Sequence, residues 1–207
     1  MTQDFSKLYD AIGKAGVIPV IKLERVEDAV PLACALLEGG IPVAEVTFRT
    51  EAAAGGIAAI RREVPQVLVG AGTVLASQQA QAAIDAGAQF VVAPGSNGSV
   101  IDQVLAASIP MIPGVATPTE IEAALEKGLQ VLKLFPAQVL GGVAMLKALA
   151  GPYPQVKFIP TGGINEANMK EYLQQENVLA VGGSWMVQAD LDEVRRLCRQ
   201  AYDNKRS

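Results

Sequence analysis

Short apolar runs alternate with alanine-rich amphipathic stretches along the whole chain. The runs begin at Val17, Val43, Val67, Phe90, Ile109, Val131, Val156 and Val178, which gives eight starts spaced by roughly 20 to 26 residues. Each run is a near-continuous series of β-favouring residues, as is typical of parallel strands buried on both faces. The spacing accommodates a strand, a loop and a helix of about three turns. The pattern therefore predicts eight β/α units in succession.

The stretches between the runs predict helices. Several of them end in glycine, as EDAVPLACALLEGG and PTEIEAALEKG do, and glycine commonly terminates a helix. Residues 3–13 predict an additional helix ahead of the first strand, and residues 190–203 predict a closing helix.

Eight β/α units in 207 residues favour an α/β fold of the (β/α)8 or TIM-barrel type, with an extra N-terminal helix. An open doubly wound sheet has the same alternation and is the alternative. The count of eight and the lack of a dinucleotide-binding fingerprint after the first run favour the barrel. No linker or compositional break indicates a second domain, so we expect one domain over residues 1–207.

Composition narrows the function classes. The net charge is −4 and no basic run is present, which argues against a nucleic-acid surface. No apolar stretch approaches the roughly 18 residues of a membrane span, and the polar start lacks the apolar region of a signal peptide. The two cysteines, Cys34 and Cys198, lie far apart without a CxxC spacing, which predicts reduced thiols in a cytoplasmic protein.

Histidine is absent from the sequence. Its absence excludes Ser–His–Asp and Cys–His catalysis, phosphohistidine chemistry and every histidine metal site. Acid–base chemistry must therefore fall to a carboxylate, lysine, tyrosine, cysteine or water. We expect neither a metal nor a cofactor.

Lys133 lies inside the apolar segment QVLKLFPA. An ammonium enclosed by hydrocarbon must be paired or solvated, or else lose its proton. A neutral lysine amine is a nucleophile that forms an imine with a ketone. The alternative is a strand-end lysine whose head reaches water. No other lysine of the chain is as enclosed by its sequence, so Lys133 is the candidate nucleophile.

Polar and aromatic residues follow other runs at the strand ends where barrel enzymes carry their chemistry. These positions are Glu45, Thr47, Arg49, Thr73, Pro94, Phe135, Thr161 and Ser184. In an extended strand Glu45, Thr47 and Arg49 point to one face, because side chains alternate. If that face is the interior, Glu45 and Arg49 lie beside Lys133. A local Glu–Arg pair on a solvated edge is the alternative.

Glycine pairs follow the last two runs. Gly162 and Gly163 come after the seventh, and Gly182 and Gly183 precede Ser184 after the eighth. The loops after strands 7 and 8 form the recurrent phosphate site of such barrels. Glycines let backbone amides approach an oxyanion, and a following helix N-terminus adds positive potential. Tight turns without a ligand are the alternative.

Several segments together resemble a known enzyme family. EVTFRTEAA, VGAGTVL, APG, IPGVATPTE, LKLFPAQVLGG, IPTGGI and VGGSW are similar to 2-keto-3-deoxy-6-phosphogluconate (KDPG) aldolases, a family that overlaps with 4-hydroxy-2-oxoglutarate (KHG) aldolases. The likeness runs in order through roughly residues 10 to 190. One departure is Gln138, where many relatives have glutamate. We expect this difference to affect loop charge or substrate preference rather than the imine chemistry.

The resemblance implies a metal-independent class I aldolase of carbohydrate metabolism in the Entner–Doudoroff pathway, cytoplasmic and homotrimeric. It implies that Lys133 forms the imine and that Glu45 is the general acid/base. It further assigns substrate contacts, with Arg49 and Thr73 at the carboxylate, Pro94 and Phe135 shaping the pocket, and Thr161, Gly162, Gly163 and Ser184 at the phosphate end.

The expected reaction splits KDPG into pyruvate and glyceraldehyde 3-phosphate, and also KHG into pyruvate and glyoxylate. One alternative is the aldolase for the galactonate-derived epimer, 2-keto-3-deoxy-6-phosphogalactonate. Another is a non-catalytic barrel that binds sugar phosphates, although binding alone does not need an enclosed nucleophile. A phosphosugar isomerase or epimerase would require a carboxylate pair or metal ligands at the strand ends, which the sequence does not offer.

Overall fold

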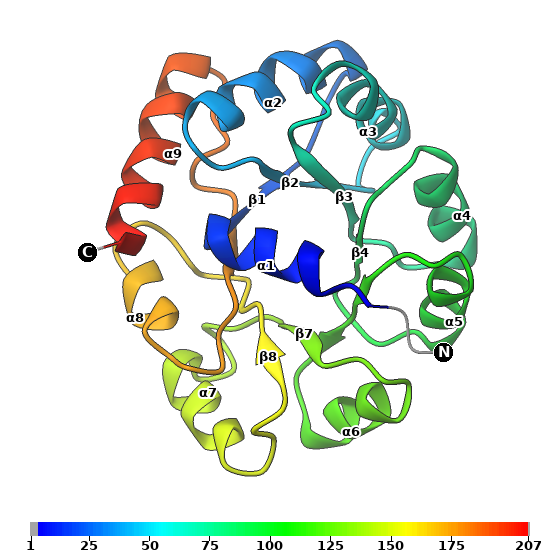
Figure 1. Cartoon of the computed structure of the whole chain (residues 1–207), viewed down its shortest axis with the longest axis vertical. Coiled ribbons are helices and arrows are strands. Elements are labelled where there is room, and N and C mark those ends of the chain that lie inside the picture. The colour runs from blue at the N-terminus through cyan, green and yellow to red at the C-terminus, as the bar shows by residue number, and fades with distance from the viewer. Residues whose placement is uncertain (1–3, 207) are drawn as a thin grey trace.

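Parallel strands form the inside of the molecule and helices surround them (Figure 1). The computed structural model describes residues 4–206. One sheet has six strands in the order β5-β4-β3-β2-β1-β9, and a second has three in the order β6-β7-β8. The strands are β1 (Val17–Ile21), β2 (Val43–Thr47), β3 (Leu68–Gly72), β4 (Val91–Val92), β5 (Met111–Ile112), β6 (Gly114–Val115), β7 (Val131–Leu134), β8 (Lys157–Phe158) and β9 (Val181–Gly183).

The fifth predicted run contains two short strands, β5 and β6, because Pro113 lies between them. Proline has no N–H to donate and interrupts the ladder at this point. Among residues 4–206, two isolated parallel bridges, Phe158 to Val178 and Thr161 to Gly182, join the other edge of the second sheet to the chain around β9. The parallel strands thus lie in two sheets that curl as a half-barrel (Figure 1), in agreement with the predicted α/β fold.

The helices alternate with the strands as predicted. They are α1 (Ser6–Ala15), α2 (Ala29–Glu38), α3 (Ala52–Glu63), α4 (Ser77–Asp85), α5 (Gly98–Ala106), α6 (Pro118–Glu126), α7 (Gly142–Ala150), α8 (Met169–Leu173) and α9 (Leu191–Arg206), with a 3-10 turn, η1 (Val26–Asp28), ahead of α2. None of the described helices is both long and apolar enough to cross a membrane.

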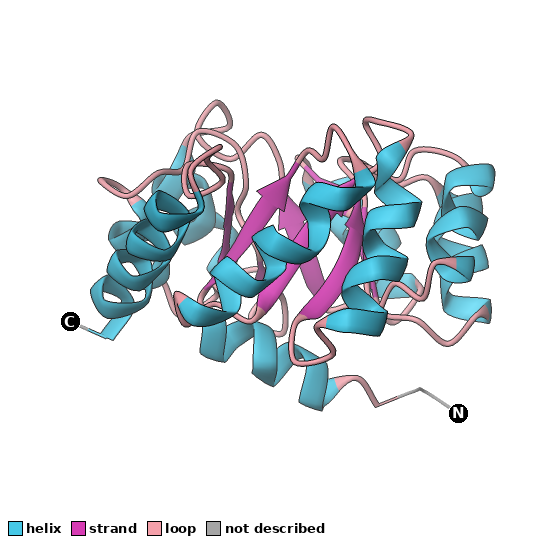
Figure 2. Cartoon of the chain, turned by 90° about the horizontal axis from the view of Figure 1, so that it is seen from above, coloured by secondary structure: helices cyan, strands magenta, loops and turns pink. Residues whose placement is uncertain are grey.

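Helix α1 lies across the end of the molecule where the strands begin (Figure 2). Its Ile12 is completely buried, and Gly16 ends the helix with a φ of 74°. The predicted leading helix at residues 3–13 is thus present but begins at Ser6, and residue 3 lies outside the described part of the chain. The opposite end, where the strands finish, is left to the loops.

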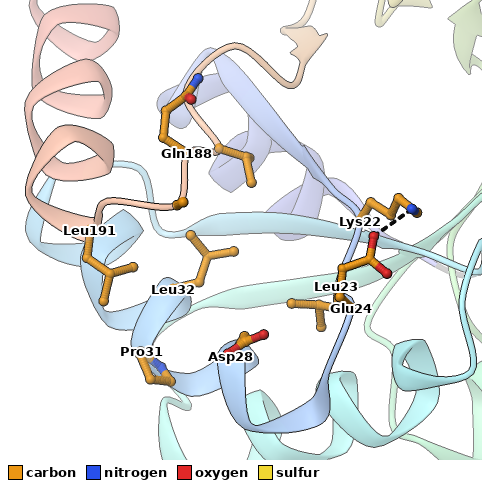
Figure 3. A pocket seen from close by; sticks show the side chains of 10 residues that line it. Lys22, Leu23, Glu24, Asp28, Pro31, Leu32, Gln188 and Leu191 are labelled. Atoms are coloured by element: carbon orange, nitrogen blue, oxygen red, sulfur yellow. Dashed lines mark hydrogen bonds and ion pairs between the residues drawn. The ribbon is translucent and has the colours of Figure 1, made fainter.

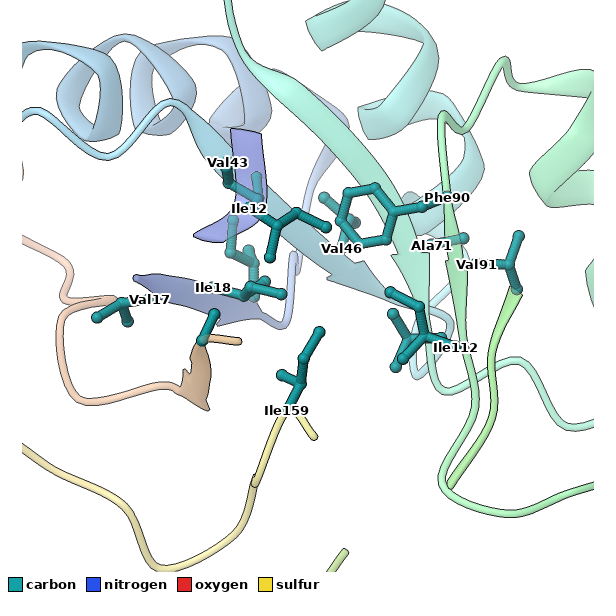
Figure 4. Packing of buried hydrophobic residues seen from close by; sticks show 14 of the residues in the cluster. Ile12, Val17, Ile18, Val43, Val46, Ala71, Phe90, Val91, Ile112 and Ile159 are labelled. Carbon is teal, nitrogen blue, oxygen red and sulfur yellow. The ribbon is translucent and has the colours of Figure 1, made fainter. Parts of the chain in front are cut away.

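The interior is built from branched and aromatic side chains that meet from neighbouring strands (Figure 4). Val43, Val46 and Ile112 are buried there with Phe90. The ring of Phe90 fits because position 70 is glycine, where a Cβ atom would lie 2.5 Å from Cδ2 of the ring. This packing joins β3 to the segment before β4, and the parallel ladder between β2 and β3 aligns the carboxyl ends of those two strands.

Candidate functional site

Lys133 is buried in the middle of β7. All four residues of this strand are buried, and the Lys133 side chain is only 5% exposed. Its Nζ lies 3.3 Å from Oε1 of Glu45, whose side chain is 2% exposed. The amine therefore does not reach solvent as a snorkelling lysine would. The structure brings together the two residues to which the sequence assigns the central chemistry.

The ring of Phe135 forms another wall around the amine. The Nζ atom of Lys133 lies 5.4 Å from the centroid of that ring, within the range of a cation–π contact. The backbone N–H groups of Lys133 and Phe135 donate to the carbonyls of Pro113 and Val115. These hydrogen bonds to residues 113–115 fix the register of β7, and so they fix where Lys133 and Phe135 lie along it.

Glu45 and Thr47 share the buried face of β2, as alternation predicts. The hydroxyl of Thr47 donates to the carbonyl of Ile21 at 2.7 Å, so this side chain ties β2 to β1. Strand β2 ends at Thr47, and the N–H of Arg49 donates back to the Thr47 carbonyl at 2.8 Å in a tight turn. The extended alternation therefore stops before Arg49.

Arg49 is exposed and lies beyond the end of β2, so the alternation that would place it on the face of Glu45 does not extend to it. It lines a surface groove of about 420 Å³ with residues of α3 and α4, among them Glu51 and Gln79. No carboxylate of residues 4–206 pairs with its guanidinium. A local Glu45–Arg49 pair is also not formed, because Glu45 pairs with Lys133.

Two further predicted residues lie at neighbouring strand ends. Thr73 directly follows β3 and has a φ of 55°, a left-handed conformation that is uncommon for residues other than glycine and clusters at functional sites. Pro94 is half-buried after β4, and its carbonyl packs so closely on Gly114 that a Cβ atom there would collide with it. Both residues thus lie in unusually constrained backbone.

The loops after β8 and β9 are adjacent. Thr161 is buried, and it bridges to Gly182, where a Cβ atom would meet the Thr161 side chain. Gly162 and Gly163 have φ values of 99° and 78°, conformations that favour glycine. Ser184 is exposed directly after β9.

One expectation for these loops is wrong. No helix N-terminus directly follows either glycine pair, since α8 begins at Met169 and α9 at Leu191. Turns and irregular segments occupy the intervening residues. Any anion held there would depend on loop amides and on hydroxyl groups rather than on a helix dipole.

Gln138 contacts the loop that contains Gly162 and Gly163. Its backbone N–H donates to the Gly162 carbonyl at 3.0 Å, and a Cβ atom on Gly163 would lie 2.5 Å from the Cβ of Gln138. The Tyr172 hydroxyl donates to its Oε1 at 2.7 Å, and burial together with nearby Glu171 raises the pKa of that tyrosine. The sequence identified Gln138 as a departure but gave no sign of the contact with Tyr172.

One largely apolar groove on the surface includes neither Lys133 nor Glu45. It measures about 510 Å³ and is lined by Lys22, Leu23, Glu24, Asp28, Pro31, Leu32, Val187, Gln188, Ala189 and Leu191 (Figure 3). Lys22 reaches the surface there and pairs with Glu24 at 2.6 Å. None of the predicted site residues lines this groove. The candidate site is therefore identified by the buried Lys133–Glu45 pair and not by the shape of the surface.

The described residues offer no evident metal centre. Nowhere in residues 4–206 do three or more Cys, Asp or Glu side chains gather as ligands. Lys133 and Glu45 instead form an isolated amine–carboxylate pair. Such a pair can supply a nucleophile and a proton acceptor within one enclosed space.

Comparison with known proteins agrees with this chemistry. The sequence model of the family described as KDPG and KHG aldolase matches residues 9–199. The 2-dehydro-3-deoxy-phosphogluconate aldolase of Treponema pallidum (strain Nichols) is 56% identical over 199 residues, which are 93% of this chain and 95% of that protein. The KHG/KDPG aldolase of Escherichia coli (strain K12) is 46% identical over 193 residues, 90% and 91% of the two chains.

The fold is also similar to that of a solved structure. The KDPG aldolase of Legionella pneumophila, with pyruvate captured at low pH as a covalent carbinolamine intermediate, superposes with a TM-score of 0.90 at 42% identity. The match covers 93% of this chain and 97% of that one. A carbinolamine is the adduct that precedes an imine, so the captured species is the kind that an enclosed lysine would form.

Proposed function

The chain belongs to the KDPG and KHG aldolase family, and on that premise we propose that Lys133 and Glu45 carry out its carbon–carbon bond cleavage. The enzyme is a class I, metal-independent aldolase. The proposal depends above all on the 3.3 Å approach of Lys133 Nζ to Glu45 Oε1 in a buried interior.

The reaction begins at the amine. The neutral Nζ of Lys133 attacks the keto carbon of the substrate, and loss of water gives a protonated imine that acts as an electron sink. Glu45 accepts the proton of the 4-hydroxyl group, directly or through water, and the bond between carbons 3 and 4 breaks. The aldehyde leaves, and the enamine of pyruvate stays on Lys133. Protonation of its methylene carbon and hydrolysis release pyruvate and restore the amine.

The substrate carboxylate is proposed to lie between Arg49 and Thr73. The guanidinium of Arg49 has no carboxylate partner among the described residues, and arginine binds carboxylates through two parallel hydrogen bonds. Thr73 lies at the adjacent strand end in a constrained conformation. Pro94 and Phe135 are proposed to shape the pocket between these groups and Lys133.

The opposite end of the substrate is proposed to lie on the loops after β8 and β9. Thr161, Gly162, Gly163 and Ser184 offer amide and hydroxyl donors there, and the bridge between Thr161 and Gly182 keeps the two loops adjacent. A phosphate group suits such a set of donors. A plain substrate such as KHG would leave part of this end unused.

The architecture is proposed to be a closed (β/α)8 barrel with an extra N-terminal helix, formed by residues 1–207 as one aldolase domain. The bridges Phe158 to Val178 and Thr161 to Gly182 support closure on one side. On the other side the N–H of Lys133 donates to the carbonyl of Pro113, which directly follows β5. One domain is consistent with a family match over residues 9–199.

We propose that the protein is a homotrimer, that it lies in the cytoplasm and that it acts in the Entner–Doudoroff pathway. The unpaired state of Cys34 and Cys198 supports a reducing compartment. Light scattering of the purified protein tests the trimer directly, and a mass corresponding to a monomer would contradict it.

Borohydride reduction in the presence of pyruvate tests the chemistry. The expected result is a covalent adduct on the Lys133 peptide that needs both pyruvate and reductant. Lys133→Ala should abolish the adduct and KDPG cleavage, whereas the exposed Lys147→Ala in α7 serves as the matched control and should retain both. Labelling of another lysine would overturn the assignment.

Parallel assays define the substrate. Cleavage rates on KDPG, on its galactonate-derived epimer and on KHG separate the three aldolase activities. A protein that binds these compounds but never forms the pyruvate adduct would be a non-catalytic sugar-phosphate-binding barrel.

A further inference from the structure

The glycines of β3 occupy the same face as the candidate acid. In register, Glu45 of β2 lies opposite Gly70 of β3, and Thr47 lies opposite Gly72. Because side chains alternate along parallel strands, positions 70 and 72 face the same interior as Glu45 and Thr47. Positions 70 and 72, which are neighbours on the interior face of β3, therefore carry no side chain.

The two glycines make room for different neighbours. At Gly70 an added Cβ atom would meet the ring of Phe90. At Gly72 the three nearest atoms all belong to Glu45, with its Cγ at 2.5 Å, its Cδ at 2.7 Å and its Oε1 closer still. The carboxylate of Glu45 thus lies directly over the α-carbon of Gly72.

This position shows the path of the Glu45 side chain. It does not stand over its register partner, Gly70, but leans along the strand direction to Gly72, two residues nearer the carboxyl end. From there its Oε1 reaches Nζ of Lys133 at 3.3 Å. A methyl group at position 72 would fill the space through which the carboxylate passes.

Glycine is not required at position 72 by its backbone. Gly72 is absent from the glycines with positive φ, so alanine can adopt its conformation. All three atoms that alanine would displace belong to the unbranched side chain of Glu45, and none belongs to backbone or to a ring. Alanine at this position is therefore compatible with the fold but not with the observed place of the Glu45 carboxylate.

We propose that Gly72 is a positioning residue of the aldolase reaction, because its missing side chain admits the Glu45 carboxylate to Lys133. The inference rests on the proposed function of that pair. Gly72 does not touch the reacting atoms and acts only through Glu45. The two residues should therefore be energetically coupled, which a purely structural glycine would not be.

A double-mutant cycle tests the coupling, with KDPG cleavage and the exchange of pyruvate methyl protons for deuterium as readouts. Gly72→Ala should fold with a wild-type circular dichroism spectrum and lower kcat by at least about 10-fold, a part of the 10²–10⁴-fold typical of general acid–base assistance, with KM little changed. Deuterium exchange should fall in parallel. In the Glu45→Ala background the same glycine substitution should change kcat by less than about twofold.

Gly151→Ala is the matched control. Gly151 directly follows α7, has a φ of −65° that alanine can adopt, and has open space where the added methyl group would lie. This control should leave all readouts unchanged. Wild-type kcat in Gly72→Ala, an equal loss in both backgrounds, or failure of Gly72→Ala to fold would each refute the positioning role. Those three outcomes leave the proposed function intact. Full activity of Glu45→Ala, or the absence of a pyruvate adduct on Lys133 in the wild-type protein, would instead refute the proposed function and the inference with it.

Discussion

The amine of Lys133 and the carboxylate of Glu45 are 3.3 Å apart although the two residues lie 88 positions apart in the sequence. The two residues come from different sheets, and each side chain is at most 5% exposed. Removal of either partner would leave an uncompensated group in a desolvated space. The same burial shields the two groups from bulk solvent, so that a bound substrate would be their nearest partner for proton transfer.

Glu45→Gln should separate imine formation from turnover. The amide keeps the shape of the carboxylate but cannot accept the proton of the 4-hydroxyl group, so kcat for KDPG should fall by about 10²–10⁴-fold. Borohydride trapping of pyruvate should be less affected than cleavage. Glu126→Gln, an exposed change at the end of α6, should have no effect on either measurement. Equal rates for Glu45→Gln and wild type would remove Glu45 from the mechanism.

Chelators should leave the activity unchanged. The protonated imine serves as the electrophile, and the described residues show no cluster of metal-binding side chains. Cleavage of KDPG should therefore proceed at the same rate before and after prolonged treatment with EDTA. A large loss that added Zn²⁺ or Mg²⁺ restores would contradict the metal-independent reaction.

Ser184→Leu should discriminate between phosphorylated and plain substrates. Loss of a hydroxyl donor and added bulk at the end of β9 should raise KM for KDPG by about 10-fold or more, since a hydrogen bond to a charged group contributes about 1.5–3 kcal/mol. KM for KHG should change much less. Ser6→Leu, an exposed serine at the opposite end of the strands, is the control. Equal effects on the two substrates would argue against a phosphate site at this loop.

Stability should decline in alkaline solution. Burial raises the pKa of the Cys198 thiol from its ordinary 9.0 to about 12, and burial likewise raises the pKa of Tyr9 to about 12. Above pH 9 the unfolded chain begins to release these protons while the folded protein retains them. The stability contributed by the protonated groups is therefore complete below pH 9 and is lost as the pH rises towards 12.

Thermal unfolding between pH 8 and pH 11 measures this effect. Each group contributes a slope of at most about 1.4 kcal/mol per pH unit. Cys198→Ala should lower the melting temperature overall but flatten its decline with pH. An unchanged slope in this variant would show that Cys198 does not contribute to the alkaline transition.

Much of the fold follows from local pattern. Strands buried on both faces need continuous apolar runs, and each of the eight predicted runs contains a strand, although several strands begin one to three residues later than their runs. The enclosure of Lys133 was predictable for the same reason, because hydrocarbon flanks it on both sides in the sequence. Its meeting with Glu45 follows once the two strands share an interior.

Other features depend on contacts that the sequence does not display. The break at Pro113 separates two sheets, although the run around it reads as one strand. Arg49 leaves the extended path because its N–H turns back onto Thr47. The space at Gly72 matters only because Glu45 leans along its strand, and the only sign of it in the sequence is the pair of glycines two residues apart in VLVGAG.

The distance in sequence between the acid and the amine has a consequence for synthesis. A chain emerging from the ribosome carries Glu45 long before Lys133, and neither sheet alone contains both residues. A chain that ends before β7 thus contains Glu45 without the lysine that pairs with it. The buried amine–carboxylate pair is therefore formed only when both sheets are present, so the proposed active site depends on completion of the fold.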